Sequence, residues 1–216
     1  MDVYEAIKKR RSVRKYLDSP IPFDKIARIL DAGHNAPCAG NLQAWRFVVV
    51  KTKEKIIEIS KNCYDQLWME TAPVLIVICA DNTKITRAYG VRGERLYSIQ
   101  DCALAAMNMM IAAEEEDLST CFVGAFDERM LKRTLDIPDN ARPQAIITLG
   151  YPDERPQEPI KTELKDVIYF DKWGNKEDVK EFFPLEQYVK SGKEVAKKLS
   201  EKKNILKDIK KMLKKK

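Results

Sequence analysis

The longest nearly continuous apolar run in this 216-residue chain extends from Val74 to Ala80, and it limits the fold more than any other feature. Its first five residues, VLIVI, show no alternation of apolar and polar side chains, which is typical of a strand buried on both faces. The run is too short to cross a bilayer. A strand of this kind needs other elements packed on both sides of its sheet, so the sequence predicts a layered globular domain.

Segments with helical and strand patterns alternate around this run. Strands are predicted where short apolar runs are bounded by turn residues, and helices where apolar residues recur every three or four positions. The predicted strands are 45–50, 73–79, 121–126 and 144–149, and the predicted helices are 2–11, a helix around 26–30 that ends at Gly33 as its C′ residue, 53–62, 94–115 and 128–135. Because the connections are unequal in length, we predict an α+β fold with three layers rather than a regular parallel array.

The net charge of +6 is unevenly distributed. Residues 190–216 contain 12 lysines and three acids, so this tail carries +9 and the rest of the chain −3. A nucleic-acid enzyme more often carries its positive charge on the working surface of the fold, so this distribution disfavours that class for the body. The N-terminal residues, MDVYE, lack the apolar stretch of a signal peptide, and we therefore expect a cytoplasmic protein.

Cysteine and histidine usage argues against a metal centre. The five cysteines are 16 to 25 residues apart, so no CxxC pair exists, and His34 is the only histidine. An odd number of cysteines without a secretion signal also argues against a disulfide framework. If the protein is an enzyme, we expect an organic cofactor to supply the chemistry.

One candidate anion site is the segment RRSVR at residues 10–14. It offers three guanidinium groups and one hydroxyl, and guanidinium groups match phosphate geometry. The chain has neither a GxGxxG motif nor a P-loop, which disfavours a Rossmann cofactor site and an NTPase. The alternative is that these cations simply end a helix in solvent, where they complement its dipole.

A second candidate is the loop PCAGNLQAW at residues 37–45, which is polar and precedes an apolar strand. The amides of Asn41 and Gln43 can both donate and accept hydrogen bonds, as recognition of a ring with alternating N–H and C=O groups requires. Ordinary turns before a strand have the same composition, so a structural turn is the alternative.

Together these two segments resemble parts of the nitroreductase family of FMN flavoproteins. Four further segments complete the resemblance, which covers roughly residues 1–175 and follows the family's order. The six segments are RRSVRKY at 10–16, APCAGNLQAWRFVVV at 36–50, the AP and VLIVICAD segment at 72–81, IQDCALAAMNMMIAAE at 99–114, CFVGAF at 121–126 and ITLGYPDE at 147–154.

The resemblance implies a nitroreductase-like three-layer α+β fold, with a central mixed, mostly antiparallel sheet flanked by helices. It also implies a homodimer with exchanged arms and with FMN at the subunit interface. The implied activity is hydride transfer from NADH or NADPH through FMN to nitroaromatic, quinone or related small-molecule acceptors, with ping-pong turnover. The flavin N5 would carry the chemistry, so no catalytic side chain is implied. A deazaflavin donor stays open.

Cofactor contacts follow from the same resemblance, position by position. The 10–14 segment matches residues that bind the phosphate, ribityl chain and pyrimidine edge, and Arg14 stands where a cation stabilises the reduced flavin electrostatically. Contacts from the other subunit are implied for the 37–43 loop, and backbone contacts beside the flavin ring for Val123 and Gly124. The complete implied set is Arg10, Arg11, Ser12, Arg14, Pro37, Cys38, Asn41, Gln43, Gln66, Val123, Gly124 and Lys161.

Departures from the family pattern bear on these expectations. Cys38 replaces the usual serine and Ala44 the usual proline, while Asp117 stands where glycine is common. Cysteine is a weaker donor than serine, so Cys38 either weakens a flavin contact, supplies a redox-sensitive thiol, or is a small residue tolerated in a tight turn. The basic stretch 83–95 suits an acidic substrate, the nicotinamide cofactor's phosphate, or plain solvation as a loop.

Other functions stay open from the sequence. Residues 176–216 are predicted to form a lysine-rich helical extension beyond a domain of residues 1–175. The lysines of this tail suit salt-dependent contact with nucleic acid or an anionic membrane, which would fit a flavin-binding redox protein or sensor; a solvated ending is the alternative. Some members of the same fold instead dehalogenate substrates or fragment the flavin, and an inactive site is a further alternative.

Overall fold

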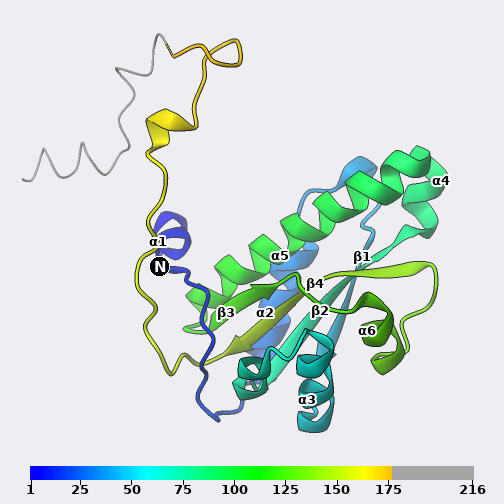
Figure 1. Ribbon diagram of the computed structural model, residues 1–216, viewed down its shortest axis with the longest axis vertical. Helices are drawn as coiled ribbons and strands as arrows, with labels where there is room; N and C mark the ends of the chain where they lie inside the picture. Colours follow the sequence, from blue (N-terminus) through cyan, green and yellow to red (C-terminus); the bar gives the residue numbers. More distant parts are fainter. Residues whose placement is uncertain (177–216) are drawn as a thin grey trace, which may run out of the picture. The chain divides into compact units, whose positions relative to one another are not determined.

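The structure, a computed structural model, describes residues 1–176 (Figure 1). The chain divides into two units, Met1–Glu158 and Pro159–Lys216. The four strands of the first unit are β1 (Trp45–Val50), β2 (Val74–Asp81), β3 (Ser119–Val123) and β4 (Ala141–Gly150). Its helices are α1 (Val3–Lys9), α2 (Phe23–His34), α3 (Lys53–Asn62), α4 (Asn82–Arg92), α5 (Ser98–Glu115) and α6 (Glu128–Thr134), with short turns at Ala39–Asn41, Leu67–Thr71 and Gly93–Tyr97.

The strands form one sheet in the order β1-β2-β4-β3, and every pair of neighbours is antiparallel. One row of paired residues, Val48, Val77, Ile146 and Val123, crosses the whole sheet. The N-terminal segment adds one isolated parallel bridge beside β3, so the four-stranded sheet itself is antiparallel throughout rather than mixed. β1 and β3 are its two edges.

Helices cover both faces of the sheet, so the predicted three-layer α+β architecture is confirmed (Figure 1). α2 and α5 pack on one face and α3 and α6 on the other. Successive β2 side chains serve the two cores in turn: Ile76 and Ile78 contact the α2 and α5 layer, while Leu75 and Val77 contact the α3 and α6 layer. This double burial explains why the β2 sequence lacks polar alternation.

One local prediction was wrong, and one of the alternatives given for the stretch 83–95 is excluded. Gly33 does not end its helix as a C′ residue: it lies inside α2 and is buried, and a Cβ there would come within 2.8 Å of Met109 Cγ, so this glycine lets α2 pack closely against Met109 of α5. The stretch 83–95 is not a loop. α4 covers most of it, with a break at Gly90, whose φ of +58° suits glycine.

The second unit is described only for residues 159–176, which include one short turn, Leu164–Asp166. The predicted lysine-rich helical tail falls outside the described residues, so it remains a prediction, as does the domain boundary at residue 175. Within residues 1–176, no helix has both the length and the apolar character needed to span a membrane.

Candidate functional site

The arginine-rich segment of residues 10–14 is bound along the edge strand β3. Ser12 forms an isolated bridge with Thr120, and the Val13 amide donates to the Thr120 carbonyl over 3.1 Å. Val13 is buried in the core under α3 and α6, while Ser12 is half-buried and Arg14 is exposed. The backbone therefore holds the polar side chains of this segment at the sheet edge.

A buried hydroxyl network supports this segment from below. The Tyr16 hydroxyl donates to the Val13 carbonyl over 2.6 Å and lies 2.6 Å from Thr148 Oγ1. Thr148 Oγ1 in turn accepts from the Cys121 amide over 3.1 Å. Burial raises the pKa of Tyr16, so the phenol stays protonated and keeps its donor. The network ties the segment to β3 and β4 together.

The guanidinium groups of this segment have different surroundings. Arg10 carries a buried Nε that has no hydrogen-bond partner. Arg11 donates to the Lys8 carbonyl and lies 3.7 Å from Glu158. The Arg14 guanidinium lies 5.8 Å from the centre of the Trp68 ring, a cation–π geometry. Arg10 thus retains an unused buried donor.

Two further segments lie at this edge of the sheet: the residues that precede β2 and those that directly follow β3. Gln66 Nε2 donates to the Ala125 carbonyl over 3.1 Å, which places Gln66 next to the end of β3. The Val123 side chain is buried in the core, whereas Gly124 is exposed, and a Cβ on Gly124 would meet only Phe122, at 3.5 Å. The backbone at 123–124 is therefore open to a ligand.

The 37–43 loop lies at the other edge of the sheet, directly before β1. Three of its residues have left-handed backbone: Gly40 (φ +55°), Asn41 (φ +56°) and Gln43 (φ +51°). A Cβ at Gly40 would also come within 2.3 Å of the Tyr89 hydroxyl, so glycine is needed there for two reasons. Left-handed backbone is costly for the other two residues, and the surrounding structure must stabilise it.

Polar groups of this loop bond mainly to one another. Gln43 Nε2 donates to the Asn41 carbonyl over 3.3 Å and to Asn41 Oδ1 over 3.2 Å. The Gln43 amide donates to Cys38 Sγ over 3.4 Å. Cys38 is thus a hydrogen-bond acceptor inside a tight turn. The Asn41 and Gln43 amide groups that sequence analysis singled out lie together.

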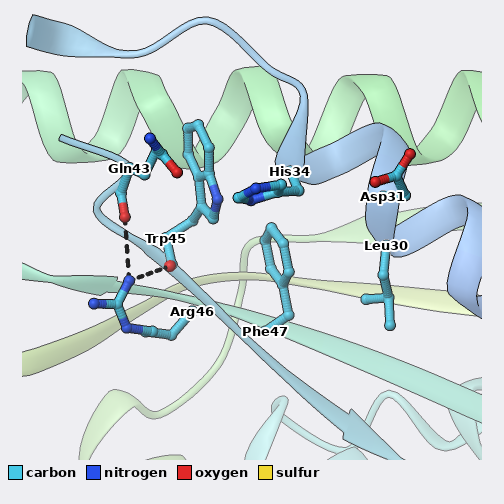
Figure 2. Close-up of a pocket in the computed structure, with 7 residues that line it drawn as sticks. All are labelled: Leu30, Asp31, His34, Gln43, Trp45, Arg46 and Phe47. Atoms are coloured by element: carbon cyan, nitrogen blue, oxygen red, sulfur yellow. Dashed lines mark hydrogen bonds between the residues drawn. The ribbon is translucent and has the colours of Figure 1, made fainter. Parts of the chain in front are cut away.

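Two surface hollows flank this loop. Pro37 and Cys38 line one of about 620 Å³ next to the start of α5. Gln43 lines a second, of about 510 Å³, with aromatic side chains between α2 and β1. Figure 2 shows the His34 ring in that second hollow between Trp45 and Phe47, with its centroid 6.4 Å from that of Trp45.

The predicted site residues therefore form two separate groups in one chain. The 10–14 segment lies near the end of α5, because the Arg10 and Arg11 charges act on Glu114. The 37–43 loop lies near its beginning, at Asp101. Asp101 and Glu114 are 13 residues apart, about 20 Å along the helix.

Lys161, the remaining predicted contact, is exposed in the second unit, and its role remains a prediction. Sequence analysis missed two residues that support the groups: Tyr16 beneath the arginine-rich segment and Asp101 beside the loop. Asp101 had a usable signal, since it is an acid directly before the apolar stretch 102–107 of the 99–114 segment. Within residues 1–176, no three His, Cys, Asp or Glu side chains cluster as metal ligands.

The fold and this grouping define an α+β protein with a two-part polar site. A sequence model described as "Nitroreductase family" matches residues 7–68 and 56–151. A Methanothermobacter thermautotrophicus protein named "Putative NADH dehydrogenase/NAD(P)H nitroreductase" is 34% identical over 177 residues, covering 80% of this chain and 88% of that protein. The chain belongs to the nitroreductase family, as the sequence resemblance predicted.

Two further relatives carry informative names. A Bacillus subtilis protein named "FMN reductase (NADPH)" is 29% identical over 161 residues, covering 68% of this chain and 65% of that one. The solved structure of an "FMN-dependent Nitroreductase" from Clostridium difficile is 28% identical, with a TM-score of 0.68 over 78% of this chain and 98% of that one.

Proposed function

We propose that this protein is a homodimeric FMN-dependent oxidoreductase that uses NADH or NADPH. Support comes from family membership and from relatives named NAD(P)H nitroreductase, FMN reductase and FMN-dependent nitroreductase. The absence of a GxGxxG motif or P-loop agrees with a cofactor site built from the side chains of separate segments.

The residues of the 10–14 segment fit the phosphate end of FMN. A dianionic phosphate needs several donors, and here Arg10 retains a buried Nε–H without a partner, while Ser12, two residues later in the sequence, carries a hydroxyl. An unsatisfied buried donor on a cation is costly, and an anionic ligand would relieve that cost. Arg11 would add charge to the same end, and the role of Lys161 in the second unit remains a prediction.

The main structural support for the proposed homodimer is the distance between the two residue groups along α5. One chain places the arginine-rich segment and the 37–43 loop about 20 Å apart along α5. Two copies with antiparallel α5 helices would place the loop of each beside the segment of the other, since a two-fold axis exchanges the helix ends. Two apolar side chains of α5, Ile99 and Leu104, are exposed and suit such an interface.

Roles for the chain's own residues follow from this arrangement. Bound FMN supplies a ring that accepts hydride from a nicotinamide and passes electrons to a second substrate. The Arg14 guanidinium, which lies over the Trp68 ring, would place positive charge beside the flavin. Gln66, Val123 and Gly124 would hold the ring from the same chain, while Pro37, Cys38, Asn41 and Gln43 would hold it from the other.

The acceptors we propose are nitroaromatic compounds, quinones or related small molecules, reduced with ping-pong kinetics in the cytoplasm. One donor and one acceptor would use the same shared pocket in turn, so the protein needs to orient each substrate rather than supply an acid–base pair. This agrees with the sequence, which has a single histidine.

The test is the visible absorption spectrum of the purified protein, with identification of any flavin released by heat and anaerobic titration with NADH and NADPH. We expect a yellow protein that releases FMN and bleaches with one or both nucleotides, and a dimer by light scattering. A colourless protein that FMN cannot reconstitute would refute the proposed activity. A flavin-loaded monomer would refute the shared site alone.

A further inference from the structure

Asp101 is an unusual residue for its place in the fold. It lies in the first turn of α5 and is 3% exposed, the only buried carboxylate within residues 1–176. Burial raises the pKa of this carboxyl, and its hydrogen bond to the Ala39 amide only partly offsets the effect. Burying a carboxyl that would be ionised at neutral pH costs free energy of folding, so we expect Asp101 to have a specific role.

One oxygen of this carboxyl has a visible role. Asp101 Oδ1 accepts from the Ala39 amide over 3.0 Å, a contact between residues 62 positions apart. The other backbone bonds of the loop are either internal, such as that from the Leu42 amide to the Ala39 carbonyl at 3.1 Å, or come from Arg46 shortly after it, whose Nη1 donates to the Gln43 carbonyl over 3.1 Å. Asp101 is therefore the hydrogen-bonded link between α5 and a loop with left-handed backbone at Gly40, Asn41 and Gln43.

The second oxygen has no partner. Asp101 Oδ2 is buried without a hydrogen bond, and Asp101 lines the 620 Å³ hollow together with Pro37 and Cys38. One oxygen of this carboxyl thus bonds to the loop, while the other is left without a partner in a residue that lines the hollow.

We propose that Asp101 is a positioning residue for the cofactor site. Through Ala39 it holds the 37–43 loop in the left-handed conformation that presents Cys38 and Asn41. The inference rests on the proposed function, because it assigns Asp101 to the loop that contacts FMN from the other subunit.

Three variants of the full-length protein separate positioning from general stability. Asp101→Leu is nearly isosteric but removes the acceptor, Asp101→Asn keeps an acceptor oxygen, and Thr134→Val removes a buried hydroxyl bonded to Glu58 and Asn62 on the opposite face of the sheet. We expect Asp101→Leu to weaken FMN binding about tenfold or more, while Asp101→Asn and Thr134→Val stay within about threefold of the wild type. FMN titration by fluorescence quenching measures these affinities.

Amide hydrogen exchange at Ala39 gives a readout that does not depend on flavin. We expect slow exchange in the wild type and in Asp101→Asn, and at least tenfold faster exchange in Asp101→Leu with unchanged exchange in the core of α5. If Asp101→Leu does not fold, Asp101→Ala is measured in its place. The rate of amide exchange at Ala39 in the wild type tests the proposal in either case. Fast exchange at Ala39 in the wild type, or equal FMN affinity in Asp101→Leu and wild type, would overturn the proposal.

These outcomes also separate the two proposals. A wild type that binds no FMN refutes the proposed function and the cofactor role of Asp101. Slow, Asp101-dependent exchange at Ala39 in that same protein would still show that Asp101 holds the loop.

Discussion

The two halves of the candidate site are stabilised in different ways. The arginine-rich segment uses backbone bonds to an edge strand, a buried valine and the Tyr16 hydroxyl beneath it. The 37–43 loop has no strand to pair with and instead relies on left-handed residues, bonds among its own polar groups and one carboxyl from α5.

This difference indicates different mobilities. A segment bonded into a sheet opens only when the sheet edge opens, whereas a loop held from outside by Asp101 and Arg46 side chains can rearrange locally at lower cost. A cofactor held by both would have a rigid phosphate end and an adaptable ring end, which suits an enzyme that must admit two substrates in turn.

The largest expected effect is at the rigid half. Arg10→Ala removes a guanidinium with an unused buried donor and should weaken FMN binding about 10- to 100-fold, the range expected for a charge-assisted contact. Arg129→Ala makes the same charge change at an exposed position on α6 and should leave affinity unchanged. Equal FMN affinities of the two variants, measured by titration of apoprotein, would remove Arg10 from the site.

A smaller effect is expected at the adaptable half. Asn41→Ala and Asn41→Gly both lose the amide and should bind FMN about tenfold more weakly, but only Ala is disfavoured at φ +56°. We expect the free energy of unfolding of Asn41→Ala to be about 1 kcal/mol below that of Asn41→Gly. Urea unfolding of the apoproteins measures this difference. Full flavin content in both variants would show that this amide makes no contact with FMN.

The support beneath the arginine-rich segment should matter for stability more than for binding. Tyr16→Phe removes a hydroxyl that contacts Val13 and Thr148 and should cost about 1–2 kcal/mol of unfolding free energy. FMN affinity should fall by less than about tenfold, because the Val13 amide remains bonded to Thr120. Tyr64→Phe, at an exposed tyrosine, is the control and should change neither. A loss of flavin without a loss of stability would contradict this division.

The smallest effect concerns pH. Because burial raises the pKa of Asp101 in the folded state, folding favours the neutral acid. This contribution to stability is complete below the ordinary pKa of the carboxyl and is lost as pH rises through the folded value. Asp101→Asn should therefore be more stable than the wild type at pH 7, with the advantage disappearing in acid. Thermal unfolding between pH 4 and 8 measures it, and parallel curves for the two proteins would show that Asp101 does not titrate on unfolding.

Sequence patterns predicted the bounds of a helix or strand well where one face, or both faces, of the element are buried along its length. β1 and α3 match their predicted bounds, because each carries apolar residues at the spacing of its own element. The errors fell where a distant contact decides the conformation. Gly33 is required by Met109 of α5, which no local pattern reveals. α4 has a weak apolar face and a glycine break, so its sequence resembled a loop.

The sequence by itself determined the layered α+β architecture, the cation cluster of the arginine-rich segment and membership of a flavoprotein family, since apolar periodicity and local residue order carry this information. Only the tertiary structure separated the predicted contacts into two groups and linked Asp101 to Ala39. Hydrogen bonds between residues 62 positions apart, and distances measured along a helix, depend on how elements pack rather than on their local sequence.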